Sequence, residues 1–118
     1  MPELPKHIEQ QIAEFQYLEN QLQLLLLQKQ QLSAQLSEIN EALEELAKST
    51  GEIYVASGPI LVQSTKEETE KELSEKKETA NVRLSAISKQ EEKIRSKLNE
   101  IRQKLESELG KTSTVAGG

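Results

Sequence analysis

Apolar residues recur every seven positions from Ile8 to Leu46, a repeat that is typical of long helices packed along a shared seam. With Ile8 at heptad position a, ten of the twelve a and d residues are apolar. The twelve are Ile8, Gln11, Phe15, Leu18, Leu22, Leu25, Lys29, Leu32, Leu36, Ile39, Leu43 and Leu46. The repeat predicts a first helix over about residues 5–49, with Pro5 in its first turn and Gly51 beyond its end.

A second heptad repeat occupies the other half of the chain, where eight of the eleven a and d residues are apolar. These residues are Leu73, Lys77, Ala80, Leu84, Ile87, Glu91, Ile94, Leu98, Ile101, Leu105 and Glu108. Thr65 and Glu68 have the spacing of a capping box, so the predicted second helix spans about residues 66–109. Residues 110–118 are mostly small or polar and are predicted to form a flexible tail.

The composition favours a single domain over residues 1–118 that has no globular core. The chain contains one Phe, two Tyr and no Trp with which to fill a large interior. Charged residues of both signs make up 30% of the sequence, which is typical of long helices. We therefore expect a mainly α fold in which the two helices fold back on each other as an antiparallel coiled coil. Folding about Gly58 sets Lys29 near Glu91 across the seam, where this pair would fix the register.

The segment between the two helices, EIYVASGPILVQST, is rich in β-branched and aromatic residues and lacks the heptad repeat. This change predicts a β-hairpin over residues 52–63. Ser57 and Gly58 are expected to form a two-residue turn, with Pro59 at the first position of the second strand. Centring the hairpin on this turn predicts two cross-strand pairs, Val55 with Ile60 and Tyr54 with Leu61.

Both faces of the predicted hairpin are apolar. The residues responsible are Ile53, Tyr54, Val55, Ile60, Leu61 and Val62. A two-stranded hairpin is only marginally stable in water, and the sequence offers no third strand, so we expect other chains to complete this sheet. The hairpin residues are therefore predicted to form a subunit interface. The alternative is that the hairpin only caps the coiled coil, although a cap would not need two apolar faces.

The formal net charge of −5 disfavours binding to nucleic acid or to anionic membranes. The sequence contains no cysteine, and hence no disulfide and no thiolate metal site. No segment approaches the roughly 20 apolar residues of a membrane span, and the start MPELPKHIEQ lacks the apolar run of a signal peptide. We expect a soluble, cytoplasmic protein with no metal site. Acidic residues interrupt the basic run of Lys89, Lys93, Arg95 and Lys97, which therefore indicates a mixed solvated face.

The order helix, hairpin, helix resembles the archaeal prefoldin β subunits over nearly the whole chain. The resemblance lies in LPKHIEQQIAEFQYLENQLQLLLLQKQQL and in IYVASGPILVQSTKEETEKELSEKKE, of which SGPILV is the most specific part. It implies a hexamer of two α and four β chains, in which the hairpins complete an intermolecular β-barrel. The α chains of the family carry two hairpins, whereas this sequence has one.

The resemblance also implies a function, that of an ATP-independent chaperone. Such complexes capture non-native proteins and deliver them to a group II chaperonin, so the implied partners are an α subunit, further β copies, client proteins and the chaperonin. Neither a cofactor nor an enzymatic activity is expected: the sequence lacks a glycine-rich phosphate loop and a nucleophile with a partner base. His7, the single histidine, is interpreted as a solvated or helix-start residue.

Client proteins are predicted to bind at the helix ends remote from the hairpin. Antiparallel pairing brings six apolar residues together there: Leu4, Ile8, Ile12, Phe15, Leu105 and Leu109. Gln11 and Glu108 interrupt the seam at this end, so it should open more easily than the rest of the coil. The alternative is an ordinary packed coil end.

Three further leucines, Leu24, Leu26 and Leu27, crowd the outer face of the first helix. They are consistent with a second client contact, with a contact to a neighbouring subunit, or with isolated apolar residues tolerated at a surface. Two other functions also remain open. A structural or adaptor coiled coil would need only the heptads and a partner of fixed stoichiometry, whereas a coiled-coil arm for tRNA would need a basic face.

Overall fold

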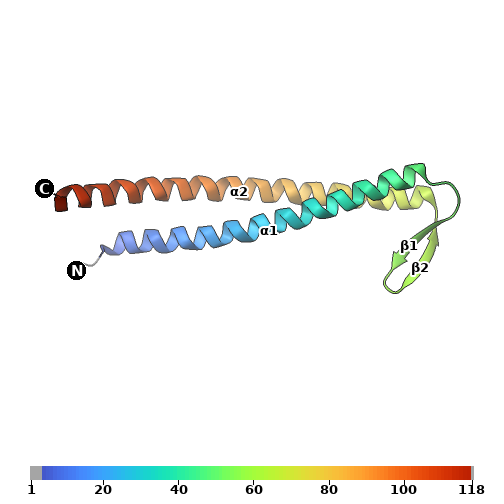
Figure 1. Ribbon diagram of the computed structural model, residues 1–118, viewed down its shortest axis with the longest axis horizontal. Helices are drawn as coiled ribbons and strands as arrows, with labels where there is room; N and C mark the ends of the chain where they lie inside the picture. The colour runs from blue at the N-terminus through green and yellow to red at the C-terminus, as the bar shows by residue number, and fades with distance from the viewer. Residues whose placement is uncertain (1–3, 118) are drawn as a thin grey trace. The chain divides into compact units, whose positions relative to one another are not determined.

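The computed structural model describes the backbone of residues 4–117 and the side chains of residues 4–110. The order of elements is helix α1 (Lys6–Lys48), strand β1 (Ile53–Ser57), strand β2 (Ile60–Ser64) and helix α2 (Lys66–Gly117), as Figure 1 shows. The predicted fold, two long helices separated by one β-hairpin, is confirmed. Among the described residues, neither helix contains a stretch long and apolar enough to cross a membrane.

The chain divides into two compact units. We call residues 1–28 with 87–118 the terminal unit, and residues 29–86 the hairpin unit. In each unit α1 and α2 run antiparallel. In the terminal unit Glu14 Oε1 lies 3.4 Å from Lys97 Nζ, and in the hairpin unit Lys66 Nζ donates a hydrogen bond of 3.1 Å to the Ala47 carbonyl. Lys29 and Glu91 belong to different units, and their pairing remains a prediction.

The heptad repeats locate the apolar seam correctly in both helices. All of the predicted seam residues listed above are buried or half-buried. Those that are most completely buried are Ile8, Leu32, Leu46, Ala80 and Ile101. The side chains between them on the helix surfaces are mostly exposed, which is the distribution expected when a narrow apolar stripe is covered by one partner helix.

The helix ends are set by local hydrogen bonds. The Pro5 carbonyl accepts the N–H groups of Ile8 and Glu9, so Pro5 immediately precedes the first turn of α1. Thr65 Oγ1 accepts the N–H of Glu68 at 3.1 Å, which confirms Thr65 as the N-cap of α2. Beyond the end of α1, Gly51 has a φ of 100°, a conformation that favours glycine, and the chain turns there toward β1.

Helix α2 continues to Gly117, past the end predicted near Leu109. The prediction relied on the end of the heptad repeat, but the absence of seam residues does not terminate a helix. No proline follows Leu109, and Gly110 weakens a helix by only about 1 kcal/mol. The flexibility proposed for residues 110–118 stays a prediction, and Gly118 lies outside the described residues.

The hairpin register predicted from the sequence is wrong by one residue in the position of its turn. Gly58 and Pro59, rather than Ser57 and Gly58, connect the strands, and Ser57 pairs with Ile60. Gly58 has a φ of 60°, and the proline ring holds φ near −65°, which together suit a two-residue turn with glycine first. The observed register also contains the pairs Val55 with Val62, Ala56 with Leu61 and Tyr54 with Gln63.

Candidate protein-binding surfaces

The hairpin exposes a group of large apolar side chains. Leu61 is 71% exposed, Ile60 is 60% exposed and Tyr54 is 54% exposed. Val62 is exposed as well, whereas Ile53 and Val55 are half-buried. Figure 1 shows why: within the hairpin unit, β1 and β2 stand apart from the helices, so no helix covers the sheet. The sequence-predicted interface residues thus lie together on two paired strands and are largely open to solvent.

The hairpin is a two-stranded sheet, so each strand pairs with only one neighbour among the residues that the structure describes. The outer edge of each strand therefore presents backbone N–H and C=O groups that a strand of another chain can bind. Together with the exposed apolar faces, these edges have the chemistry of an incomplete sheet.

A hydrogen bond at the start of β1 orders one of the exposed side chains. The Tyr54 hydroxyl donates to Glu52 Oε2 over 2.5 Å. This bond, followed by a small effect of desolvation, raises the pKa of the Tyr54 hydroxyl above its usual value, because ionising the phenol would remove the donor beside a carboxylate.

The six tip residues predicted from the sequence all belong to the terminal unit, but they differ in accessibility. Leu4 is 45% exposed and Leu109 is 43% exposed, whereas Ile8 is only 3% exposed. Ile12, Phe15 and Leu105 are half-buried. In this closed arrangement Leu4 and Leu109 are directly available to a partner, the half-buried residues are partly accessible, and Ile8 requires the helices to separate first.

Polar groups lie beside this apolar cluster. His7 is an exposed residue in the first turn of α1, and its Nε2 atom lies 2.9 Å from Glu108 Oε2 of α2, so it also makes an interhelical contact. Gln11 Oε1 is buried in the seam without a hydrogen-bond partner. An unpaired buried acceptor costs about 1–3 kcal/mol, which makes this part of the seam weaker than an apolar layer would be.

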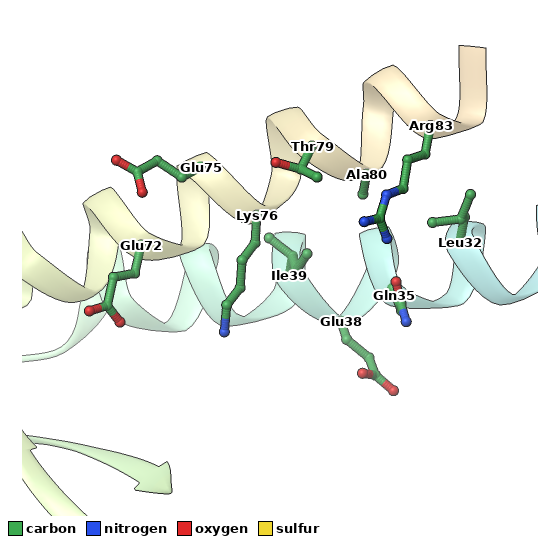
Figure 2. A pocket seen from close by; sticks show the side chains of 10 residues that line it. All are labelled: Leu32, Gln35, Glu38, Ile39, Glu72, Glu75, Lys76, Thr79, Ala80 and Arg83. Carbon is green, nitrogen blue, oxygen red and sulfur yellow. The ribbon is translucent and has the colours of Figure 1, made fainter. Parts of the chain in front are cut away.

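Two grooves between α1 and α2 were not predicted from the sequence. The groove in the hairpin unit has a volume of about 580 Å³ and is drawn in Figure 2. Leu32 and Ile39 of α1 and Ala80 of α2 lie at its base, while Glu72 and Lys76 extend along its side. The residue that could have indicated this groove in the sequence is Ala80, because it is small and most other seam positions carry Leu or Ile.

The second groove belongs to the terminal unit and has a volume of about 340 Å³. Leu26 is one of its lining residues and is 37% exposed. Leu24 and Leu27, which the sequence grouped with Leu26, are 55% and 53% exposed. The three leucines therefore do not form one equivalent set, because only Leu26 lies at the junction between the helices.

Comparison with known proteins agrees with this arrangement. Residues 9–112 match the family described as prefoldin subunit. This chain therefore belongs to the prefoldin family of chaperone subunits. The resemblance to archaeal prefoldin β subunits is confirmed by the relatives and the solved structure that follow.

Two relatives align along almost their whole length. The prefoldin subunit beta of Archaeoglobus fulgidus is 43% identical over 111 residues, which cover 92% of this chain and 96% of the relative. The prefoldin subunit beta of Methanosarcina barkeri is 34% identical over 110 residues, which cover 92% of this chain and 94% of the relative. The crystal structure of the prefoldin beta subunit from Thermococcus strain KS-1 matches with a TM-score of 0.85 and 33% identity, covering 92% of this chain and 97% of that one. Membership of the family implies assembly with other prefoldin subunits.

Proposed function

We propose that this chain is the β-type subunit of an ATP-independent holdase chaperone in the cytoplasm. Two α-type and four β-type chains form a hexamer, which their hairpins hold together. The complex binds non-native proteins at the ends of its helices and passes them to a group II chaperonin. The observation that supports this proposal most directly is the contrast within the chain: its helices cover their own seam, whereas its sheet remains incomplete and apolar.

The proposed client site consists of the six tip residues, Leu4, Ile8, Ile12, Phe15, Leu105 and Leu109. Each apolar group contributes roughly 1.5–3 kcal/mol when it is fully buried, and the loss of freedom on binding offsets much of this gain. One tip alone therefore binds weakly. Several tips joined in one complex raise the effective concentration for each further contact and strengthen binding by about 10²–10⁴. Because this mechanism needs no shaped pocket, it accepts clients of differing sequence.

The assembly part of the proposal is tested by Leu61→Asp, which introduces a carboxylate into the exposed part of the hairpin. Leu61 is 71% exposed in this chain, so the substitution should leave the fold of the isolated chain intact. In an apolar barrel the buried charge costs several kcal/mol at each equivalent site, and the hexamer should not form. Val82→Asp is the matched control, because Val82 is 65% exposed on α2. Assembly of the Leu61→Asp chain at native mass would exclude the hairpin as the interface.

The client site is tested by removing the residues before Ile12 together with those after Leu105. This truncation leaves the hairpin unit complete, and we expect a complex of unchanged subunit number. That complex should no longer prevent aggregation of an unfolded model protein. Full protection by the truncated complex would place the client site elsewhere. An adaptor function would instead show one partner bound at fixed stoichiometry and no protection by the full-length complex.

A further inference from the structure

The two flanks of the helix pair in the terminal unit differ in chemistry. One flank carries ion pairs that cross between α1 and α2, His7 with Glu108 and Glu14 with Lys97. Arg95 and Arg102 each follow a d residue of the heptad repeat and so lie on the other flank, where each donates to a residue of its own helix. Arg95 Nε donates to Glu91 Oε2 at 3.2 Å, four residues away on α2. The second flank is therefore not bridged by these arginines, and the junction of the helices is hollow there.

This hollow is the 340 Å³ groove of the terminal unit. Its apolar lining comes from both helices: Phe15, Leu22 and Leu26 from α1 and Leu98 from α2. Leu26, 37% exposed, leaves part of this lining accessible to solvent. An apolar trough formed by two helices has the shape that receives one face of a third helix.

Two arginines stand along the α2 side of the groove, Arg95 and Arg102. They are seven residues apart, which is about 10.5 Å along a helix. Arg102 Nη2 donates to Asn99 Oδ1 at 2.8 Å, and Arg95 uses its Nε for Glu91. A guanidinium has five N–H donors, so each arginine retains donors for a carboxylate. The lining residues include these two arginines and one carboxylate, that of Glu19, while the Glu91 carboxylate, which does not line the groove, is ion-paired with Arg95.

We propose that this groove binds an amphipathic helix of a client protein that carries two acidic residues about two turns apart beside its apolar face. The apolar side chains fill the trough, and the two carboxylates meet Arg95 and Arg102. This inference rests on the proposed chaperone function and adds to it a class of preferred segment and a second contact, which shares Phe15 with the tip residues. It also gives Leu26 a role that Leu24 and Leu27 do not share.

The test uses the assembled complex of full-length chains and two fluorescent synthetic peptides. The first peptide places Leu at positions i, i+3 and i+7 of a helix and Glu at two flanking positions seven apart. The second peptide has Lys in place of both Glu. We expect the acidic peptide to bind more tightly and to lose affinity as salt is raised, because screening weakens contacts between exposed charges.

Replacing both arginines, Arg95→Gln with Arg102→Gln, should weaken binding of the acidic peptide about tenfold. Binding of the basic peptide should stay the same or become tighter, because the substitutions remove two like charges. Lys93→Gln with Lys104→Gln is the matched control, because it removes the same charge from exposed positions that do not line this groove. For the apolar side, Leu26→Gln should weaken binding of both peptides, whereas Leu24→Gln should not.

Equal binding of the two peptides would overturn the inference, as would equal effects of the arginine and lysine double variants. Binding of a single-stranded oligonucleotide that is lost in the arginine variant would assign the two arginines to nucleic acid instead. The proposed function is judged separately, by whether the unmodified complex prevents aggregation of a model client. A complex that protects the client but does not distinguish the peptides would refute this inference alone.

Discussion

Gln11 shows how one side chain weakens a seam that is otherwise apolar. Its Oε1 atom is buried without a hydrogen-bond partner, in the unit that carries the proposed client site. A leucine at the same d position would remove the unpaired acceptor and add apolar contact. The polar residue therefore costs stability at the place where helix separation would expose Ile8 and its neighbours.

Gln11→Leu should accordingly stabilise the chain, by about 1 kcal/mol in urea denaturation. It should also reduce protection of an unfolded client, because the tip then opens less often. Gln10→Leu is the control, since Gln10 is exposed on the same helix. A Gln11→Leu chain that is no more stable than the original would show that the glutamine acceptor is satisfied by solvent.

Tyr54 provides a second prediction at this scale. Because its pKa is raised by the hydrogen bond to Glu52, the Tyr54 phenol should ionise at a higher pH than an ordinary tyrosine in a spectroscopic titration. A folded-state pKa above the unfolded one means that the contribution of this bond is complete below about pH 10. It is lost as pH rises through the folded pKa. Glu52→Gln should lower the Tyr54 pKa, and an unchanged value would assign the shift to another cause.

At the scale of elements, the hairpin turn depends on a glycine for its backbone conformation. Gly58 has a φ of 60°, and a Cβ atom added there would meet no other atom within 4 Å. The penalty of Gly58→Ala is therefore confined to the left-handed conformation and should be about 1 kcal/mol. Gly110 likewise has open space around it but lies within helix α2.

Gly58→Ala should thus lower the melting temperature of the assembled complex, whereas Gly110→Ala should leave it unchanged or raise it. The same chemical change has opposite expected signs because only the first glycine has positive φ. If both variants melted alike, the turn would not limit the stability of the assembly.

The elements also show where sequence reasoning succeeded and where it stopped. The seam was predicted residue by residue, because a heptad repeat states directly which face of a helix is covered. The register of the hairpin was not predicted correctly, because both faces of the strands are apolar. No alternation of apolar and polar residues distinguishes a pair of Val55 with Ile60 from a pair of Val55 with Val62. The two grooves depend on local side-chain size and on the direction in which Arg95 bonds, neither of which a repeat encodes.

At the scale of the whole molecule, the chain buries the apolar residues of one part by itself and leaves those of another part exposed. The seam residues are covered within the chain, whereas Ile60 and Leu61 of the sheet are exposed. The two parts should therefore respond differently to partner subunits.

Hydrogen exchange can measure this difference. In the isolated chain, amides of β1 and β2 that point away from the paired edge should exchange rapidly, and amides of α1 near Leu32 slowly. Adding α-type subunits should slow exchange in the strands and leave the Leu32 region unchanged. Slow exchange throughout the hairpin before any partner is added would show that the chain already completes its sheet with copies of itself.

Because the helices are antiparallel, their contacts enclose very different lengths of chain. Lys66 and Ala47 are 19 positions apart, whereas His7 and Glu108 are 101 positions apart. Closing the longer loop directly from the unfolded chain costs about 1.5 kcal/mol more in entropy, since each doubling of length adds about 0.6 kcal/mol. The chain avoids this cost if pairing of the helices begins beside the hairpin and extends toward the termini, because each paired turn positions the next. Separation of the helices should then start at the termini. Warming should therefore weaken the proposed client contacts before the helix segments next to the sheet separate.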